Sequence, residues 1–275
     1  MFIEIKTVLI TGASSGIGHI LCQYLLSEGY FVVATGRSVD KLRCSFEETA
    51  LMNPNLKLAE MDVSDSRDIV IALNKLRSDG ISVDVLVNNA GYGLTGLLET
   101  MSTDEISSQF QTNVFGLMEV TRNVLPSMKK RNMGKVINIG SVLGRFSVPW
   151  NGAYSASKFA VEGFSECLRY ELHGTGIYVS VIEPGLFDTK FRDNQIRSKG
   201  SIREYATPKN NYLKIARRRG SDPVKIAHLV SKIITTRRPK LRYVVGWDAQ
   251  MALFLKGILP SRVFEYLVWK FTRHI

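Results

Sequence analysis

The chain has 275 residues, of which 45% are hydrophobic and 22% charged, and its formal net charge is +11. This length is enough for one α/β domain with a large core, and no low-complexity tract or interdomain linker divides it. The cysteines Cys22, Cys44 and Cys167 are scattered without a CxxC motif and the four histidines lack metal-ligand spacing, which excludes a disulfide scaffold and predicts no metal. Neither a signal-peptide pattern nor an apolar run of about 18 residues occurs, so a cytoplasmic location is expected.

The chain opens on the pattern of a strand, a glycine turn and a helix. An apolar run predicts a strand over 6–11, and helical spacing of apolar residues begins at Ile20. Between them lies Thr11-Gly12-Ala13-Ser14-Ser15-Gly16-Ile17-Gly18. Glycines permit a tight turn and a close backbone approach to a pyrophosphate, and the helix N-terminus supplies free N–H groups. This turn, with Gly12, Ser14, Ser15, Gly16, Ile17 and Gly18, is therefore the predicted phosphate site of a dinucleotide.

The next three strands are predicted over 30–36, 56–61 and 83–88. Arg37 follows the first of them, where an acid binds the ribose 2′-hydroxyl of NAD and an arginine accommodates the 2′-phosphate of NADP. The sequence therefore predicts a preference for NADP(H) over NAD(H). Asp62 and Val63 follow the next strand and are expected near the adenine, and the last strand runs into Asn88-Asn89-Ala90-Gly91.

Three further strands are predicted over 135–140, 177–183 and 241–246. Strands that alternate with helical patterns imply parallel βαβ units. The predicted fold is therefore α/β, a Rossmann-type doubly wound parallel sheet of seven strands in the order 3-2-1-4-5-6 with the seventh at the edge. The catalytic domain is expected over 1–246, followed by a helical extension over 247–275. Ligands bind such sheets in the crevice at the carboxyl ends of the strands.

Tyr154 and Lys158 lie four residues apart, so a helix places them on one face. An unperturbed tyrosine has a pKa of about 10, and a nearby cation lowers that pKa because it favours the phenolate. The pair is a candidate general acid and base for an oxygen that gains or loses a proton. Taken alone, the same spacing is also that of an ordinary tyrosine and an exposed lysine.

Six motifs in this order resemble those of the short-chain dehydrogenase/reductase family. They are TGASSGIG at 11–18, NNAG at 88–91, Asn113 in QTNVFG, Ser141 after VINIG, YSASK at 154–158 and Glu183-Pro184-Gly185 after the sixth strand. The resemblance covers about residues 5–190. From Arg242 onward the tail is similar to the 17β-hydroxysteroid dehydrogenase-like branch.

The resemblance implies an NADP(H)-dependent oxidoreductase with four catalytic residues. Tyr154 would be the acid/base, and Lys158 would lower its pKa and bind the nicotinamide ribose. Ser141 would hydrogen-bond the substrate oxygen, and Asn113 would hold a water that links Lys158 to solvent. The remaining cofactor-binding residues implied are Asn89, Ala90, Gly91, Pro184, Gly185 and Thr189. Related enzymes are often homodimers or homotetramers through helices that correspond to 103–131 and 154–172.

Positive charge is concentrated in the last part of the chain. Residues 197–275 hold 18 Lys and Arg against 4 Asp and Glu, a net charge of +14. Within them, 251–259 and 263–271 predict two short apolar helices punctuated by basic residues. Such helices can cover the substrate cleft, pack against a partner subunit or contact a membrane surface. A role as lid or core helices is favoured over membrane contact. Nucleic-acid binding is not expected, because no recognition motif accompanies the charge.

The residues expected at the mouth of the cleft are mostly apolar: Tyr92, Leu94, Leu143, Phe146, Val148, Trp150, Phe187 and Phe191. The segment 186–222 lies where the family carries its substrate lid. An apolar lining favours a lipophilic ketone, aldehyde or alcohol, such as a steroid, a retinoid or another lipid. Two alternatives stay open: a non-catalytic NADP(H)-sensing protein of the same fold, and an oxoacyl-thioester reductase.

Overall fold

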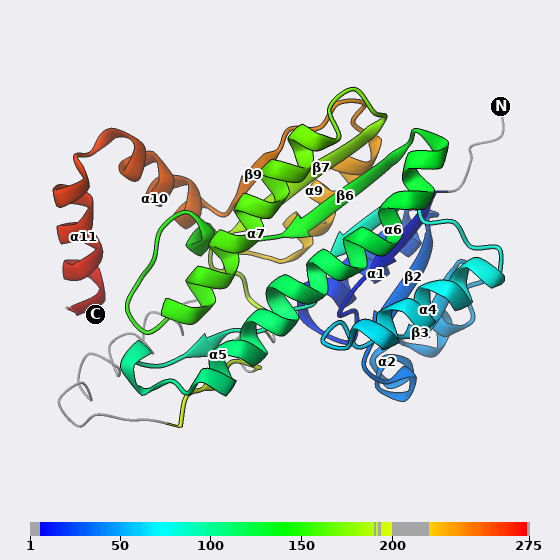
Figure 1. The fold of residues 1–275 in the computed structure, drawn as a ribbon, viewed down its shortest axis with the longest axis horizontal. Coiled ribbons are helices and arrows are strands. Elements are labelled where there is room, and N and C mark those ends of the chain that lie inside the picture. Colours follow the sequence, from blue (N-terminus) through cyan, green and yellow to red (C-terminus); the bar gives the residue numbers. More distant parts are fainter. Residues whose placement is uncertain (1–5, 190, 192–193, 200–219, 274–275) are drawn as a thin grey trace.

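A parallel sheet with helices on both faces forms the centre of the computed structural model, which describes residues 6–189, 191, 194–199 and 220–273 (Figure 1). The strand order is β3-β2-β1-β4-β6-β7-β9, which confirms the predicted topology. The predicted strand ends are correct to within two residues. The strands are β1 (Thr7–Ile10), β2 (Phe31–Gly36), β3 (Leu56–Glu60), β4 (Val85–Asn88), β6 (Gly134–Ile139), β7 (Ile177–Pro184) and β9 (Arg242–Val245).

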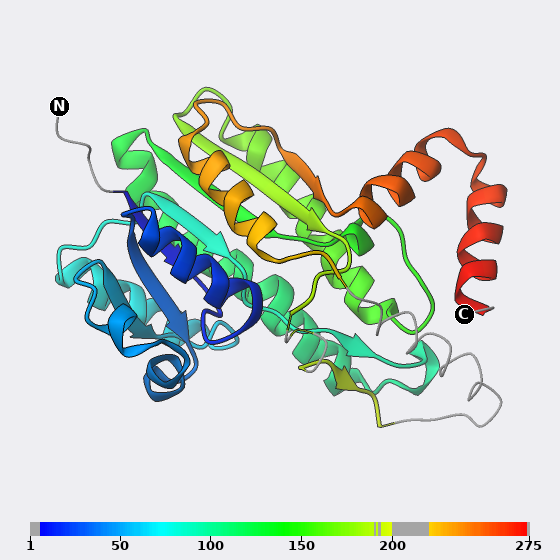
Figure 2. The same cartoon turned by 180° about the vertical axis from the view of Figure 1, so that it is seen from behind.

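Two sets of helices cover the sheet. Helices α4 (Ser66–Ser78), α6 (Leu117–Arg131) and α7 (Gly152–Glu171) lie on the face seen in Figure 1, and α1 (Gly16–Ser27) and α9 (Val224–Thr235) lie on the face seen in Figure 2. Shorter elements connect these layers. They are α2 (Val39–Ser45), α3 (Glu48–Leu51), β5 (Leu94–Thr95), η1 (Leu98–Thr100), α5 (Thr103–Phe110), the π-helical turn η2 (Gln111–Gly116), η3 (Val142–Gly144) and β8 (Ile196–Arg197).

The core consists of two apolar clusters, one on each face of the sheet. Along β1, Val8 and Ile10 belong to the cluster under α1 and α9, whereas Leu9 belongs to the cluster under α4, α6 and α7. Successive side chains of a strand point to opposite faces, so a strand covered on both sides needs a nearly continuous apolar run. The sequences TVLI and VLVN of β1 and β4 meet this requirement.

The two predicted C-terminal helices are α10 (Trp247–Ile258) and α11 (Ser261–Arg273). They extend beyond the carboxyl end of β9, away from the three layers, as both views show (Figures 1 and 2). Contacts that hold α10 in place include a 2.7 Å hydrogen bond that the Asp248 carboxylate accepts from the Leu186 N–H, and one that the Lys256 ammonium donates to the Arg145 carbonyl. Much of the predicted lid over 186–222 lies outside the described residues.

Candidate active site

One cavity of about 1890 Å³ opens at the carboxyl ends of β1, β2, β4, β6 and β7. This is the edge of the sheet where the fold predicts the ligand site. Two of the candidate residues, Gly18 and Asn113, do not line the cavity. The others do: Gly12, Ser14, Ser15, Gly16, Ile17, Arg37, Asp62, Val63, Asn89, Ala90, Gly91, Ser141, Tyr154, Lys158, Pro184, Gly185 and Thr189.

The glycine turn and the NNAG motif pack directly against each other. Gly12 has φ +67°, and a Cβ atom there would stand 2.8 Å from the Ala90 Cα. A Cβ atom on Gly18 would stand 2.4 Å from the Asn89 Nδ2. The Thr11 hydroxyl accepts hydrogen bonds from the N–H groups of Asn89 (3.0 Å) and Ala90 (2.9 Å). Gly18 therefore allows the turn to pack closely against Asn89, on the side away from the cavity. Thr11, to which the sequence analysis assigned no role, links the glycine turn to the NNAG motif.

The residues around the first turn of α1 fit the pyrophosphate of a dinucleotide. Ser15, the N-cap residue, makes no side-chain capping bond, and the first turn contains no acidic residue. Free N–H groups and the positive end of the helix dipole therefore meet the cavity at Ser14, Ser15 and Gly16 without a described side-chain acceptor. This is the donor set that binds phosphate at helix N-termini. Arg37 adds a positive charge to the same wall.

Helix α7 places Tyr154 and Lys158 side by side in the cavity wall. The Lys158 Nζ lies 5.8 Å from the centroid of the Tyr154 ring and donates a 2.8 Å hydrogen bond to the Ile139 carbonyl. Lys158 is only 6% exposed. Burial lowers the pKa of its ammonium to about 8, and the negative charge of Glu162 opposes that fall. The lysine is therefore a cation that the site keeps largely out of water.

Ser141 follows β6 and faces the same cavity as Tyr154. It is the N-cap of η3, and its Oγ accepts a 3.1 Å hydrogen bond from the Leu143 N–H. This bond fixes the side chain, and a hydroxyl that accepts one bond still has its own O–H to donate. Two hydroxyl groups, one just after β6 and one on α7, therefore line the same cavity.

Asn113 lies in η2 beneath the cavity and is 1% exposed. Its amide accepts from the Tyr92 N–H (3.1 Å) and donates to the Tyr92 carbonyl (2.9 Å) and to the Ser157 hydroxyl (3.2 Å). The side chain therefore supports the loop that carries Tyr92 and ties it to α7. Its implied role in holding a water stays a prediction.

The far part of the cavity has apolar walls. Six of the eight residues expected there line it, and Leu94 and Trp150 do not. Leu94 instead packs in a small cluster with Met101 and Ala153. Helices α10 and α11 complete the wall, and Phe264 of α11 meets Phe146 edge-on with ring centroids 5.5 Å apart. The residues these helices contribute include Met251, Leu255, Phe264, Leu267, Val268 and Phe271.

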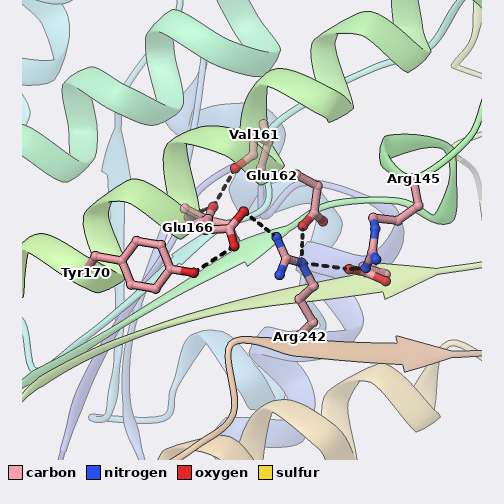
Figure 3. Close-up of polar contacts among 9 residues, drawn as sticks. Arg145, Val161, Glu162, Glu166, Tyr170 and Arg242 are labelled. Carbon is pink, nitrogen blue, oxygen red and sulfur yellow. Dashed lines mark hydrogen bonds and ion pairs between the residues drawn. The ribbon is translucent and has the colours of Figure 1, made fainter. Parts of the chain in front are cut away.

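Sequence reasoning missed a partly buried charge cluster behind α7. It consists of Arg145, Glu162, Glu166, Glu183 and Arg242, and Figure 3 shows its contacts. The available signal was the position of Glu162, four residues after Lys158 and hence on the same helix face. Among the described residues, no group of His, Cys, Asp and Glu is arranged to hold a metal ion.

Residues 6–200 match the family model described as short chain dehydrogenase. The chain belongs to the short-chain dehydrogenase family. It is thus an oxidoreductase that acts on CH–OH groups with NAD(P), as the order of its motifs predicts.

Relatives of this short-chain dehydrogenase include proteins named for lipophilic compounds. It is 38% identical over 272 residues to a 3-ketodihydrosphingosine reductase of Bacteroides thetaiotaomicron, with 95% of this chain and 96% of the relative covered. It is 36% identical over 272 residues to retinol dehydrogenase 8 of Bos taurus, with 93% of this chain and 86% of the relative covered.

Solved structures share the fold along nearly the whole chain. A short-chain dehydrogenase from Streptomyces avermitilis matches with a TM-score of 0.84 and 32% identity, and 98% of each chain is covered. A serine dehydrogenase complexed with NADP+ matches with a TM-score of 0.76 and 30% identity, over 87% of this chain and 94% of the other. A family member from Burkholderia phymatum in complex with NAD matches with a TM-score of 0.81 and 25% identity, over 97% of each chain.

Proposed function

We propose that this dehydrogenase interconverts a lipophilic ketone or aldehyde and the corresponding alcohol, with NADP(H) as the preferred dinucleotide. The observation that carries the proposal is a single cavity with three kinds of wall. It has a glycine turn at one side, the hydroxyls of Ser141 and Tyr154 beside Lys158, and apolar helices at the other side. A phosphate-binding turn, a proton donor and an apolar substrate space are what such a reaction needs.

The chain's own residues would handle the oxygen and the proton. Ser141 and Tyr154 donate hydrogen bonds to the substrate oxygen, on which negative charge develops during reduction. Tyr154 then transfers its proton to that oxygen and becomes a phenolate, and in alcohol oxidation it takes the proton back. The Lys158 ammonium stabilises the phenolate because an opposite charge nearby favours the ionised form. When bound, the nicotinamide dinucleotide supplies the hydride in reduction and accepts it in oxidation.

The preference for NADP(H) rests on Arg37. This residue follows β2 and lines the cavity, where its charge would attract a 2′-phosphate. The structures similar to this chain include complexes with NADP+ and with NAD, so the family leaves both dinucleotides open. We expect Arg37→Asp to lower the ratio of kcat/KM for NADPH over NADH by roughly tenfold or more, a loss of about 1.4 kcal/mol. Arg43→Asp, on the exposed side of α2, should leave the ratio unchanged; an unchanged ratio in Arg37→Asp would contradict the assignment.

A lipophilic substrate is supported by the walls of the cavity and by the names of the relatives. Two relatives are named for ketodihydrosphingosine and for retinol, which are both lipophilic compounds. The decisive experiment is NADPH oxidation with a panel of steroid, retinoid, long-chain and small polar carbonyl compounds. Turnover of the apolar compounds is expected, and turnover of the polar ones alone would refute the substrate class.

The same assay tests the acid/base role. Tyr154→Phe should lower kcat/KM for the best ketone by about 10²–10⁴-fold, because general acid/base catalysis contributes that much. The matched control is Tyr170→Phe on the same helix, since Tyr170 is exposed and bonds only Glu166 among the described residues. Full activity in Tyr154→Phe would show that the assigned mechanism is wrong.

We also propose that α10 and α11 contact an anionic membrane surface. No helix among the described residues is long and apolar enough to cross a bilayer. These two helices nevertheless expose large apolar side chains, including Trp247, Phe254 and Trp269, beside the exposed basic residues Arg262 and Lys270. Aromatic side chains mixed with basic ones are typical of helices that lie in a lipid interface.

Vesicle co-sedimentation tests this contact. Binding to vesicles with phosphatidylserine, weaker binding to neutral vesicles and loss of binding in Phe254→Glu/Trp269→Glu are expected. If wild-type protein does not bind vesicles and the variant instead dissociates a dimer, α10 and α11 form a subunit interface and the membrane proposal fails.

We further propose self-association through the helices at 103–131 and 154–172. Phe115 and Phe159 lie on these segments, and 52% and 45% of their surface is exposed. Light scattering should report a dimer or tetramer for wild-type protein and a smaller species for Phe115→Glu/Phe159→Glu. A monomeric wild-type protein would refute this proposal.

A further inference from the structure

The partly buried charge cluster behind α7 connects the segments that carry the candidate active-site residues. Arg145 lies just after η3 and bonds Glu183 at 2.9 Å, and Glu183 precedes Pro184 at the end of β7. Arg242 of β9 bonds Glu162 at 2.9 Å and Glu166 at 3.1 Å and lies 3.6 Å from Glu183. Figure 3 shows the guanidinium of Arg242 between the carboxylates of Glu162 and Glu166.

Glu162 and Lys158 occupy the same face of α7, one turn apart, and both are buried. They are 5% and 6% exposed. Oε2 of Glu162 bonds Arg242, whereas Oε1 is buried and has no hydrogen-bond partner among the described residues. A buried carboxylate oxygen without a hydrogen bond is costly unless a positive charge lies nearby. Arg242 lies against the other oxygen of Glu162, and Lys158, one turn away on this face of α7, is a second cation whose charge interacts with that of Glu162.

Only two carboxylates of the cluster are buried, those of Glu162 and Glu183, at 5% and 0% exposure. Arg242 bonds Glu162 and Arg145 bonds Glu183, and Glu166 is partly exposed. If Lys158 lost its proton, the buried charge of Glu162 would lose a nearby cation, which is unfavourable in a medium of low dielectric constant.

We propose that Glu162 is a positioning residue that keeps Lys158 in its ammonium form and thereby sets the upper pH limit of the reaction. This inference rests on the proposed function, in which the ammonium stabilises the Tyr154 phenolate. The pKa values agree with the geometry. Burial lowers the pKa of Lys158 to about 8, and the charge of Glu162 counteracts this. Burial also raises the pKa of Glu162 to about 7, so its carboxylate is mostly ionised at pH 8, where Lys158 is half deprotonated.

The test measures the protonation of Lys158 without any turnover. Protein carrying lysine labelled with ¹³C at Cε is titrated by NMR in the absence of dinucleotide, and the Lys158 signal is assigned by its loss in Lys158→Met. Glu162→Gln keeps the shape of the side chain and removes its charge. The midpoint is expected near 8 in wild-type protein and lower by on the order of one pH unit in Glu162→Gln.

Kinetics supply a second readout. The pH at which kcat/KM for ketone reduction falls to half its plateau should move down by the same amount in Glu162→Gln, and Glu162→Asp should restore it. Glu166→Gln is the matched control, because it removes a carboxylate that bonds the same Arg242 but lies one turn further from Lys158. Its midpoint should equal that of wild-type protein.

Three results would overturn the inference. The first is the same Lys158 NMR midpoint in Glu162→Gln and wild-type protein, and the second is an equal downward shift of that midpoint in Glu162→Gln and Glu166→Gln. The third is a loss of kcat/KM in both Glu162→Gln and Glu162→Asp that does not depend on pH. A shifted NMR midpoint in a protein that reduces no carbonyl compound would instead refute the proposed function and leave the assignment of Glu162 intact.

Discussion

Lys158 should destabilise the fold that carries it. Burial lowers the pKa of its ammonium from 10.5 to about 8, and 2.5 pKa units correspond to about 3 kcal/mol. Lys158→Met removes this cost and leaves the Ile139 carbonyl without its hydrogen bond, which costs about 1 kcal/mol. At pH 7 the loss of the Lys158 cation leaves little unpaired charge, because burial raises the pKa of Glu162 to about 7 and this carboxyl is partly protonated at that pH. The substitution should therefore raise the free energy of unfolding by about 2 kcal/mol at pH 7 while it abolishes turnover.

The sign of the effect depends on pH. Below pH 8, Lys158 is charged in both the folded and the unfolded chain, so the full cost is present in the folded state. Between pH 8 and 10.5 the folded protein releases the proton first, and the cost disappears. The advantage of Lys158→Met should thus shrink above pH 8 and turn into a small deficit near pH 10.5.

Urea unfolding of the protein without dinucleotide, at pH 7 and at pH 10, measures this difference. Lys57→Met is the control, because Lys57 pairs with Asp79 at the surface and should change stability by less than about 0.5 kcal/mol at either pH. A Lys158→Met protein less stable than wild type at pH 7, or an effect equal at both pH values, would refute the reasoning.

Two further substitutions test how the cavity is built. Gly18→Ala should lower the unfolding temperature and the free energy of unfolding, the latter by about 1–3 kcal/mol, because the added Cβ would stand 2.4 Å from Asn89 Nδ2. The control is Gly163→Ala, where a Cβ meets nothing within 4 Å. This substitution should raise the unfolding temperature slightly. Equal melting temperatures for the two would contradict the packing of the turn. Phe264→Ala should raise KM for an apolar ketone, because it removes the edge-on contact with Phe146 that holds α11 against the cavity. Such an aromatic contact contributes about 0.5–1.5 kcal/mol. An unchanged KM would show that α11 does not bound the substrate.

The sequence predicts the sheet well because its signals are local. Apolar runs and glycine turns mark each strand and its end, and the family motifs fix their order. Most candidate site residues line the cavity for the same reason, since each follows a strand whose carboxyl end meets that edge of the sheet. Gly18 and Asn113 lie behind the cavity instead, where their contacts are to Asn89 and Tyr92.

What the sequence does not predict depends on contacts between distant segments. Arg242 reaches Glu162 across 80 residues, and Asp248 reaches the Leu186 N–H across 62. Neither pair has a motif or a periodicity that would reveal it. The same holds for Leu94, whose apolar character suits a cavity wall or a core equally well, and only the packing around it decides between them.

The proposed reaction requires the hydroxyls of Ser141 and Tyr154 to bind one substrate oxygen. A crystal structure with an oxidised dinucleotide and an alcohol that the enzyme turns over measures this. We expect the alcohol oxygen within about 3 Å of both hydroxyls, with the pyrophosphate over the first turn of α1. An alcohol oxygen away from both hydroxyls, or a dinucleotide bound elsewhere, would contradict it.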